Sequence, residues 1–82
     1  MEIKVNSGLE HFREMIIATI FYGFKTVENP VSITVHPELM RKIRDNFKGK
    51  AMAPKIFDNT EIFFGLPVIE DESKEKNYIA VG

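Results

Sequence analysis

The chain has 82 residues, of which eleven are basic and twelve acidic, and it contains no cysteine. This length predicts one small domain over residues 1–82. Without cysteine, disulfide frameworks, thiolate zinc sites and cysteine nucleophiles are excluded. A secreted chain of this size usually needs disulfides, so the composition favours an intracellular or particle-associated protein.

The first thirty residues predict a short strand followed by a helix. Residues 1–5 alternate in hydrophobicity, which is typical of an edge strand. Ser7 and Glu10 have the spacing of a capping box, which would begin a helix there. We expect this helix to end at Gly23 or just after Phe24. Its hydrophobic residues recur every three or four positions, at Leu9, Phe12, Ile16, Ile20 and Phe24.

The second half of this helix is hydrophobic on nearly all sides. The apolar run over residues 15–24 is ten residues long, whereas a membrane span needs about 20, so we predict no membrane segment. Because so small a domain covers one side of such a helix at most, we predict contact with a protein partner or a second copy. For Ile20 and Phe24 a plain core position is the favoured alternative. The predicted interface anchors are Ile17, Phe21, Tyr22 and Phe24.

The middle of the chain predicts a strand and a second helix. Residues 31–35 alternate in hydrophobicity, as in a half-buried strand. His36, Pro37 and Glu38 begin a helix, because proline suits the first helical position and glutamate complements the positive helix end. Gly49 is predicted to be the left-handed residue that ends it. The inward-facing residues are expected to be Leu39, Met40, Ile43 and Phe47.

The remaining residues predict strands and turns. Residues 55–57 and 61–64 are predicted strands joined by 58–60, and residues 65–69 continue the second of them with a bend. Pro67 cannot donate to a strand ladder, so it predicts an edge or a bulge. Residues 78–81 form the last predicted strand. The order β-α-β-α-β-β-β predicts an α+β domain with two helices packed on one face of a small, mainly antiparallel sheet.

The charges are unevenly distributed. Residues 41–55 contain six basic residues and one acidic residue, and residues 58–75 contain six acidic residues and one basic residue. These are either two solvated surfaces or a self-complementary pair in which one copy meets the next. The basic helix 37–48 also suggests nucleic-acid binding, since Arg41, Arg44 and Lys48 share one face and can each neutralise a phosphate. No exposed aromatic residue lies between them to stack on bases.

The sequence contains no pattern typical of catalysis. His11 and His36 lie on different elements without metal-ligand spacing, and a surface or capping role is the simpler interpretation for each. The acidic triplet at residues 70–72 lacks the alternating carboxylates of a calcium loop. The serines have no nucleophile-elbow context and the glycines are isolated. We therefore predict no enzyme, and no catalytic, cofactor-binding or metal-binding residues.

Three short segments follow one another in a familiar order. They are Val-His-Pro-Glu-Leu-Met at 35–40, Gly-Leu-Pro-Val-Ile at 65–69 and Tyr-Ile-Ala-Val-Gly at 78–82. In this order residues 31–82 resemble the C-terminal segment of tailed-bacteriophage major capsid proteins, although the long spine helix and extended arm of a capsid subunit are missing. The resemblance implies a phage- or prophage-derived protein of the host cytoplasm or the virion, which assembles with itself or with other proteins.

The leading hypothesis is therefore a non-enzymatic interaction or assembly protein that uses the apolar helix face. The alternative is a small regulator that binds nucleic acid through the basic helix 37–48.

Overall fold

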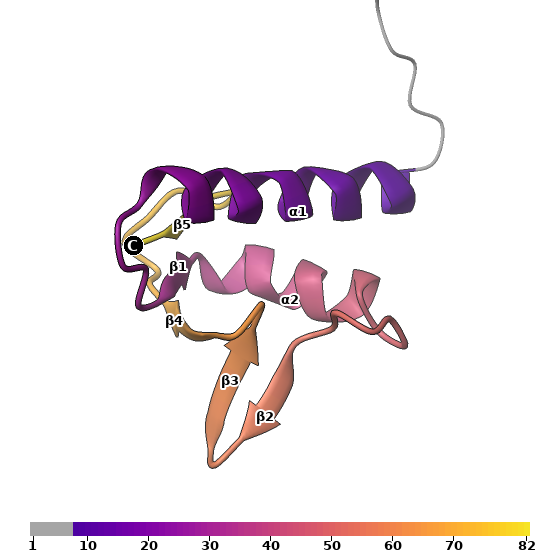
Figure 1. Cartoon of the computed structure of the whole chain (residues 1–82). Helices are drawn as coiled ribbons and strands as arrows, with labels where there is room; N and C mark the ends of the chain where they lie inside the picture. Colours follow the sequence, from indigo (N-terminus) through magenta and orange to yellow (C-terminus); the bar gives the residue numbers. More distant parts are fainter. Residues whose placement is uncertain (1–7) are drawn as a thin grey trace, which may run out of the picture.

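The computed structural model describes residues 8–82 (Figure 1). The predicted strand over residues 1–5 and the capping residue Ser7 lie outside these residues. Within the described part of the chain, neither helix combines the length and the hydrophobicity needed to cross a bilayer. The elements in chain order are α1 (Gly8–Thr26), β1 (Ile33–Val35), α2 (Pro37–Asn46), β2 (Lys55–Phe57), β3 (Thr60–Phe63), β4 (Leu66–Glu70) and β5 (Ile79–Val81).

The strands form one five-stranded sheet in the order β2-β3-β4-β1-β5. β1 and β4 are parallel, and the other three pairings are antiparallel. β4 pairs with β3 through its first two residues and with β1 through its last three. The predicted α+β class with a mainly antiparallel sheet is confirmed.

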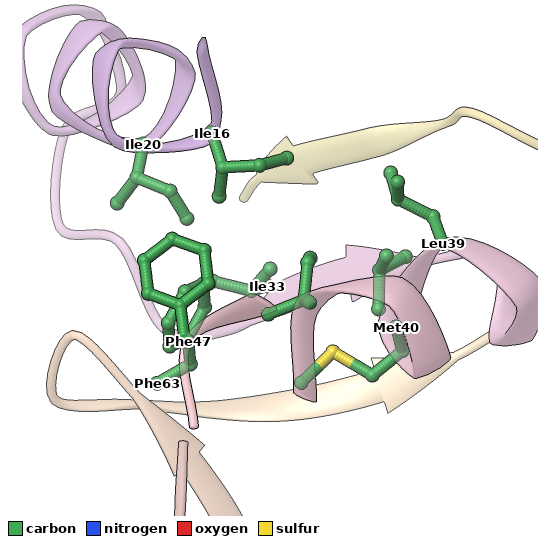
Figure 2. Close-up of a cluster of buried hydrophobic side chains, with 9 residues drawn as sticks. Ile16, Ile20, Ile33, Leu39, Met40, Phe47 and Phe63 are labelled. Atoms are coloured by element: carbon green, nitrogen blue, oxygen red, sulfur yellow. The ribbon is translucent and has the colours of Figure 1, made fainter. Parts of the chain in front are cut away.

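Both helices cover the same face of this sheet. Ile33 and Val35 of β1 are fully buried, and their side chains point to one face because strand residues two apart share a face. Ile16 and Ile20 of α1 project toward this face in Figure 2. Among residues 11–82, whose burial the structure describes, the core consists of nine buried side chains: Ile16, Ile20, Ile33, Val35, Leu39, Met40, Ile43, Phe47 and Phe63.

α2 has the predicted start and the predicted inward face. Pro37 occupies the first turn, and the imidazole Nδ1 of His36 accepts a hydrogen bond from the backbone N–H of Glu38 at 3.0 Å. The capping interpretation of His36 is thus confirmed. The four residues predicted to face inward are all buried. The helix ends at Asn46, and Gly49 follows in the left-handed region with φ of +78°.

Residues 61–69 are a hairpin, so the prediction of one bent strand is wrong. β3 ends at Phe63 and β4 begins at Leu66. Phe64 and Gly65 between them have φ of +52° and +81°, which is the backbone of a two-residue type I′ turn. A bulky residue rarely adopts positive φ. Phe64 is therefore not a residue from which a turn would be predicted.

Pro67 lies in a central strand, so the expectation of an edge or a bulge is also wrong. Pro67 is paired across from Ile62 of β3. In a two-residue hairpin this pair does not exchange backbone hydrogen bonds, so the proline nitrogen points toward the β1 side. β1 begins only at Ile33, opposite Val68. The missing N–H of Pro67 therefore falls before β1 starts and leaves no ladder bond unmade.

β1 is shorter than the strand predicted over residues 31–35. Val31 lies before its first residue and is exposed.

Gly23 allows α1 to lie close to the edge strand β5. The helix continues through Gly23 and ends at Thr26, after Phe24 as one of the two predictions had it. A Cβ atom on Gly23 would lie 2.6 Å from Cβ and 2.7 Å from Cγ2 of Val81. Gly23 thus sets the distance between the helix and the sheet.

The substitution Gly23→Ala is expected to lower the free energy of unfolding by about 1–2 kcal/mol, because overpacking outweighs the gain in helix propensity. Urea denaturation measures this change. Gly82→Ala is the matched control, since its new Cβ would meet nothing within 4 Å. A Gly23→Ala variant more stable than the wild type would contradict the close contact.

The cap of α2 can be tested at His36. His36→Ala removes the acceptor for the Glu38 N–H and should cost about 1 kcal/mol of unfolding free energy, whereas His36→Asn keeps an acceptor and should stay within about 0.5 kcal/mol of the wild type. Both values follow from urea denaturation. Equal losses in the two variants would show that His36 acts by packing and not as a cap.

Candidate interaction surface

The four predicted anchors of α1 divide into two pairs. Ile17 and Phe24 are half-buried and pack against the core. Phe21 and Tyr22 are exposed, at 54% and 67% of their surfaces. The helix is therefore covered on one side only, and the predicted second apolar side faces away from the core.

Three exposed hydrophobic side chains of α1, Met15, Phe21 and Tyr22, form a surface that we call the helix patch. Met15 and Tyr22 are seven residues apart, which places them on one side of the helix about two turns apart. The charged residues Glu14 and Lys25 are exposed on the same side. Glu14 is two turns from Phe21 on the same stripe of the helix, and Lys25 is one turn from Phe21 and Tyr22, so charged side chains of both signs lie among the apolar ones.

A chain of aromatic contacts connects the helix patch to the core. The ring centroids of Phe21 and Phe64 are 5.6 Å apart, those of Phe64 and Phe63 4.8 Å, and those of Phe63 and Phe47 5.3 Å, all with edge-to-face geometry. Such pairs add about 0.5–1.5 kcal/mol each beyond their buried area. These contacts hold Phe64 in its unfavourable positive-φ conformation, and they join α1 to the β3–β4 turn.

Phe64 also lines a shallow groove of about 540 Å³ beside the β2–β3 hairpin. Its walls are mainly apolar and include Met52, Phe57 and Ile62. Lys55 is the charged residue of the lining, and its Nζ donates a hydrogen bond to the carbonyl oxygen of Ala51 at 3.0 Å. The apolar surface of the molecule thus continues from the helix patch, through Phe64, into this groove.

The β2–β3 hairpin adds exposed apolar residues to this surface that were not among the predicted anchors. Ile56 and Phe57 of β2 are 69% and 73% exposed. Consecutive strand residues point to opposite faces, so two adjacent large apolar residues leave one of them uncovered unless both faces of the strand are packed. This pattern in Lys55–Phe57 is the sequence signal that identifies the surface.

The predicted basic surface is partly neutralised within the chain. Arg44 of α2 donates two hydrogen bonds to Glu61 of β3, at 3.0 Å from Nε and 2.7 Å from Nη2, and a third to Glu70 of β4. The hydrogen bond with Glu61, more than any other interaction, raises the pKa of Arg44 above its already high ordinary value. At Arg44 the basic and acidic stretches meet inside one molecule. Arg41 and Lys48, the other two predicted phosphate-binding residues, are exposed.

The acidic triplet at residues 70–72 is also engaged locally. Glu70 binds Arg44, and the carboxylate of Asp71 accepts hydrogen bonds from the hydroxyl of Ser73 at 2.6 Å and from its backbone N–H at 2.9 Å. The two bonds from Ser73, the hydroxyl bond first, lower the pKa of Asp71. Over residues 8–82, no three histidine or carboxylate side chains are grouped as a metal site requires.

Comparison with known proteins adds no relative. No protein-family model matches the chain, and no match was found among curated proteins or solved structures. The interpretation of function therefore depends on the exposed surface described above.

Arg44 is expected to hold α2 against β3 and β4. Replacing it by glutamine leaves Glu61 and Glu70 without their shared cation and should lower the free energy of unfolding by about 1 kcal/mol at low salt. Because the network is partly exposed, the loss should shrink at high ionic strength. Urea denaturation of the variant at two salt concentrations measures both effects.

Arg41→Gln is the matched control, because Arg41 forms no ion pair within residues 8–82, and it should stay within about 0.5 kcal/mol of the wild type. Equal losses at the two arginines would show that the network contributes nothing specific.

Proposed function

We propose that the chain is a non-enzymatic interaction or assembly protein, which docks on a protein partner or on another copy of itself through the helix patch. The observation that carries this proposal is the exposure of Phe21 and Tyr22 on a helix whose opposite side fills the core. Aromatic side chains at the centre of an apolar patch supply most of the binding energy in many protein interfaces.

The helix patch supplies part of the area that an interface needs. Each aromatic side chain can bury about 150–250 Å² when it is fully exposed. Phe21 and Tyr22 are 54% and 67% exposed, so together they offer about 200–300 Å² of contact. A stable interface buries about 800 Å² on each partner. Met15, which is 51% exposed, and the half-buried ring of Phe64 beside Phe21 extend the patch toward this size.

An origin in a phage or prophage is supported by the resemblance of residues 31–82 to the C-terminal segment of tailed-phage major capsid proteins. Phage structural proteins act by assembly, which agrees with an exposed apolar surface and with the absence of a catalytic pattern in the sequence. The corresponding location is the host cytoplasm or the virion.

Nucleic-acid binding through α2 has less support. Arg41 and Lys48 are exposed, but the guanidinium of Arg44 is bound by Glu61 and Glu70. Each phosphate contact contributes separately to affinity, so two free cations in place of three predict weaker binding. The regulator hypothesis stays a prediction of the sequence.

Photo-cross-linking tests the helix patch directly. With p-benzoylphenylalanine in place of Tyr22, irradiation of cells that express the chain should give one discrete adduct, either a dimer of the chain or a complex with another protein. Adding Met15→Asp should reduce the yield by at least about tenfold, since burying an unpaired carboxylate in the contact costs more than 1.4 kcal/mol. Gel electrophoresis and mass spectrometry quantify the adduct.

The matched control places the same cross-linker at Val31, which is 66% exposed, nearly as much as Tyr22. An adduct of equal yield at both positions, or one insensitive to Met15→Asp, would contradict docking through the helix patch. The folding of each variant is checked by circular dichroism.

A further inference from the structure

The strand β2 leaves one side of its backbone free. β2 is the outermost strand of the sheet beside β3, and all three of its residues are exposed. Asp58 and Asn59 have φ of +58° and +64°, so they form a two-residue type I′ turn. In such a hairpin the residue pair next to the turn exchanges backbone hydrogen bonds, the next pair does not, and the third pair does again. Phe57 and Lys55 therefore bond to β3, opposite Thr60 and Ile62. The N–H and C=O of Ile56 therefore point to the open side.

This free side is short, and Pro54 and Lys55 protect it in part. Natural edge strands are blunted by lysine, proline or a covering segment. Here Pro54 precedes the strand and the turn at Asp58 follows it, so both limit pairing to residues 55–57. Lys55 is the charged residue of the strand, and its ammonium group is bonded back to Ala51. Ile56 and Phe57 are left uncovered.

We propose that β2 pairs antiparallel with β2 of a second copy, which joins two sheets edge to edge in a symmetric dimer. The symmetric register places Ile56 opposite Ile56 of the second copy. Each Ile56 N–H then donates to the C=O of the other, so both free backbone groups of this edge are satisfied. This surface is separate from the helix patch and extends the proposed function.

The side chains of the same register complement each other, which favours a second copy over an unrelated strand. Lys55 faces Phe57 of the second copy on one side of the joined sheet, and the same contact repeats at the other end by symmetry. The methylene stem of Lys55 can pack against the ring of that Phe57 while its ammonium group stays bonded to Ala51. The two Ile56 side chains meet on the opposite side of the sheet.

The dimer is expected to be weak. Three residue pairs bury less than the roughly 1,000 Å² of a stable interface, so the dimer should form only at high protein concentration. Lys55 and Phe57 also line the groove, so Phe57 of the second copy lies along its rim and adds apolar contact there.

Amide hydrogen exchange of the wild-type chain, followed by NMR, tests the register. Once about nine in ten chains are paired, the exchange rate of the Ile56 amide should fall about tenfold relative to dilute protein. The amides of Lys55 and Phe57 bond to β3 and should be protected at both concentrations, so they are internal controls. The mass from light scattering should rise from 9.4 kDa toward twice that value.

Ile56→Pro removes the outward N–H without removing a bond to β3, so this variant should fold and remain a monomer at all concentrations. Ile56→Val keeps the amide and should still dimerise. An Ile56 amide that exchanges equally fast at every concentration, or an Ile56→Pro variant that still dimerises, overturns the proposal. If Ile56→Pro does not fold, the wild-type exchange decides.

A dimer whose Ile56 amide is unprotected associates through another surface. That result overturns edge pairing and leaves the helix patch as proposed. Conversely, protection of Ile56 in a chain that gives no cross-link at position 22 supports edge pairing and removes the helix patch.

Discussion

The packing of Ile16 and Ile20 against Ile33 and Val35 defines the whole molecule, because it joins one side of α1 to one face of the sheet. A chain of this length builds two layers around a single core. Each layer packs against the core through one of its two faces. The outer side of α1 and the helix-free face of the sheet therefore face solvent. Most of the large exposed apolar residues lie on the outer side of α1 and on the β2–β3 hairpin at the sheet's end.

Two tight turns determine where β2, β3 and β4 lie in the sheet. The Asp58–Asn59 turn pairs the edge strand β2 with β3 and leaves the backbone N–H and C=O of Ile56 on the open edge. The Phe64–Gly65 turn returns the chain into the centre of the sheet. Phe64 adopts a backbone conformation that is costly for a bulky residue. Its ring contacts with Phe21 and Phe63 offset that cost, and they connect the helix patch to the β3–β4 turn.

The ion pairs of Arg44 bear on the alternative proposal, which is nucleic-acid binding through α2. One guanidinium connects α2 to β3 and to β4, so it stabilises the position of the hairpin relative to the helix. The same contacts occupy a side chain that the nucleic-acid alternative would use. A surface with balanced charges and exposed aromatic rings suits a protein partner better than a nucleic acid.

Local pattern in the sequence determined α2 almost completely, from the His36 cap to the buried Phe47, because capping and helical periodicity involve residues within one or two turns. It also determined the existence of α1, the α+β class and the apolar excess of α1. Tertiary structure alone decided which of the α1 residues are exposed, that Phe64 occupies a turn, that Pro67 fits a central strand and that Arg44 meets Glu61 and Glu70. Each of these depends on which strands pair across long distances in the chain, and no local periodicity specifies that pairing.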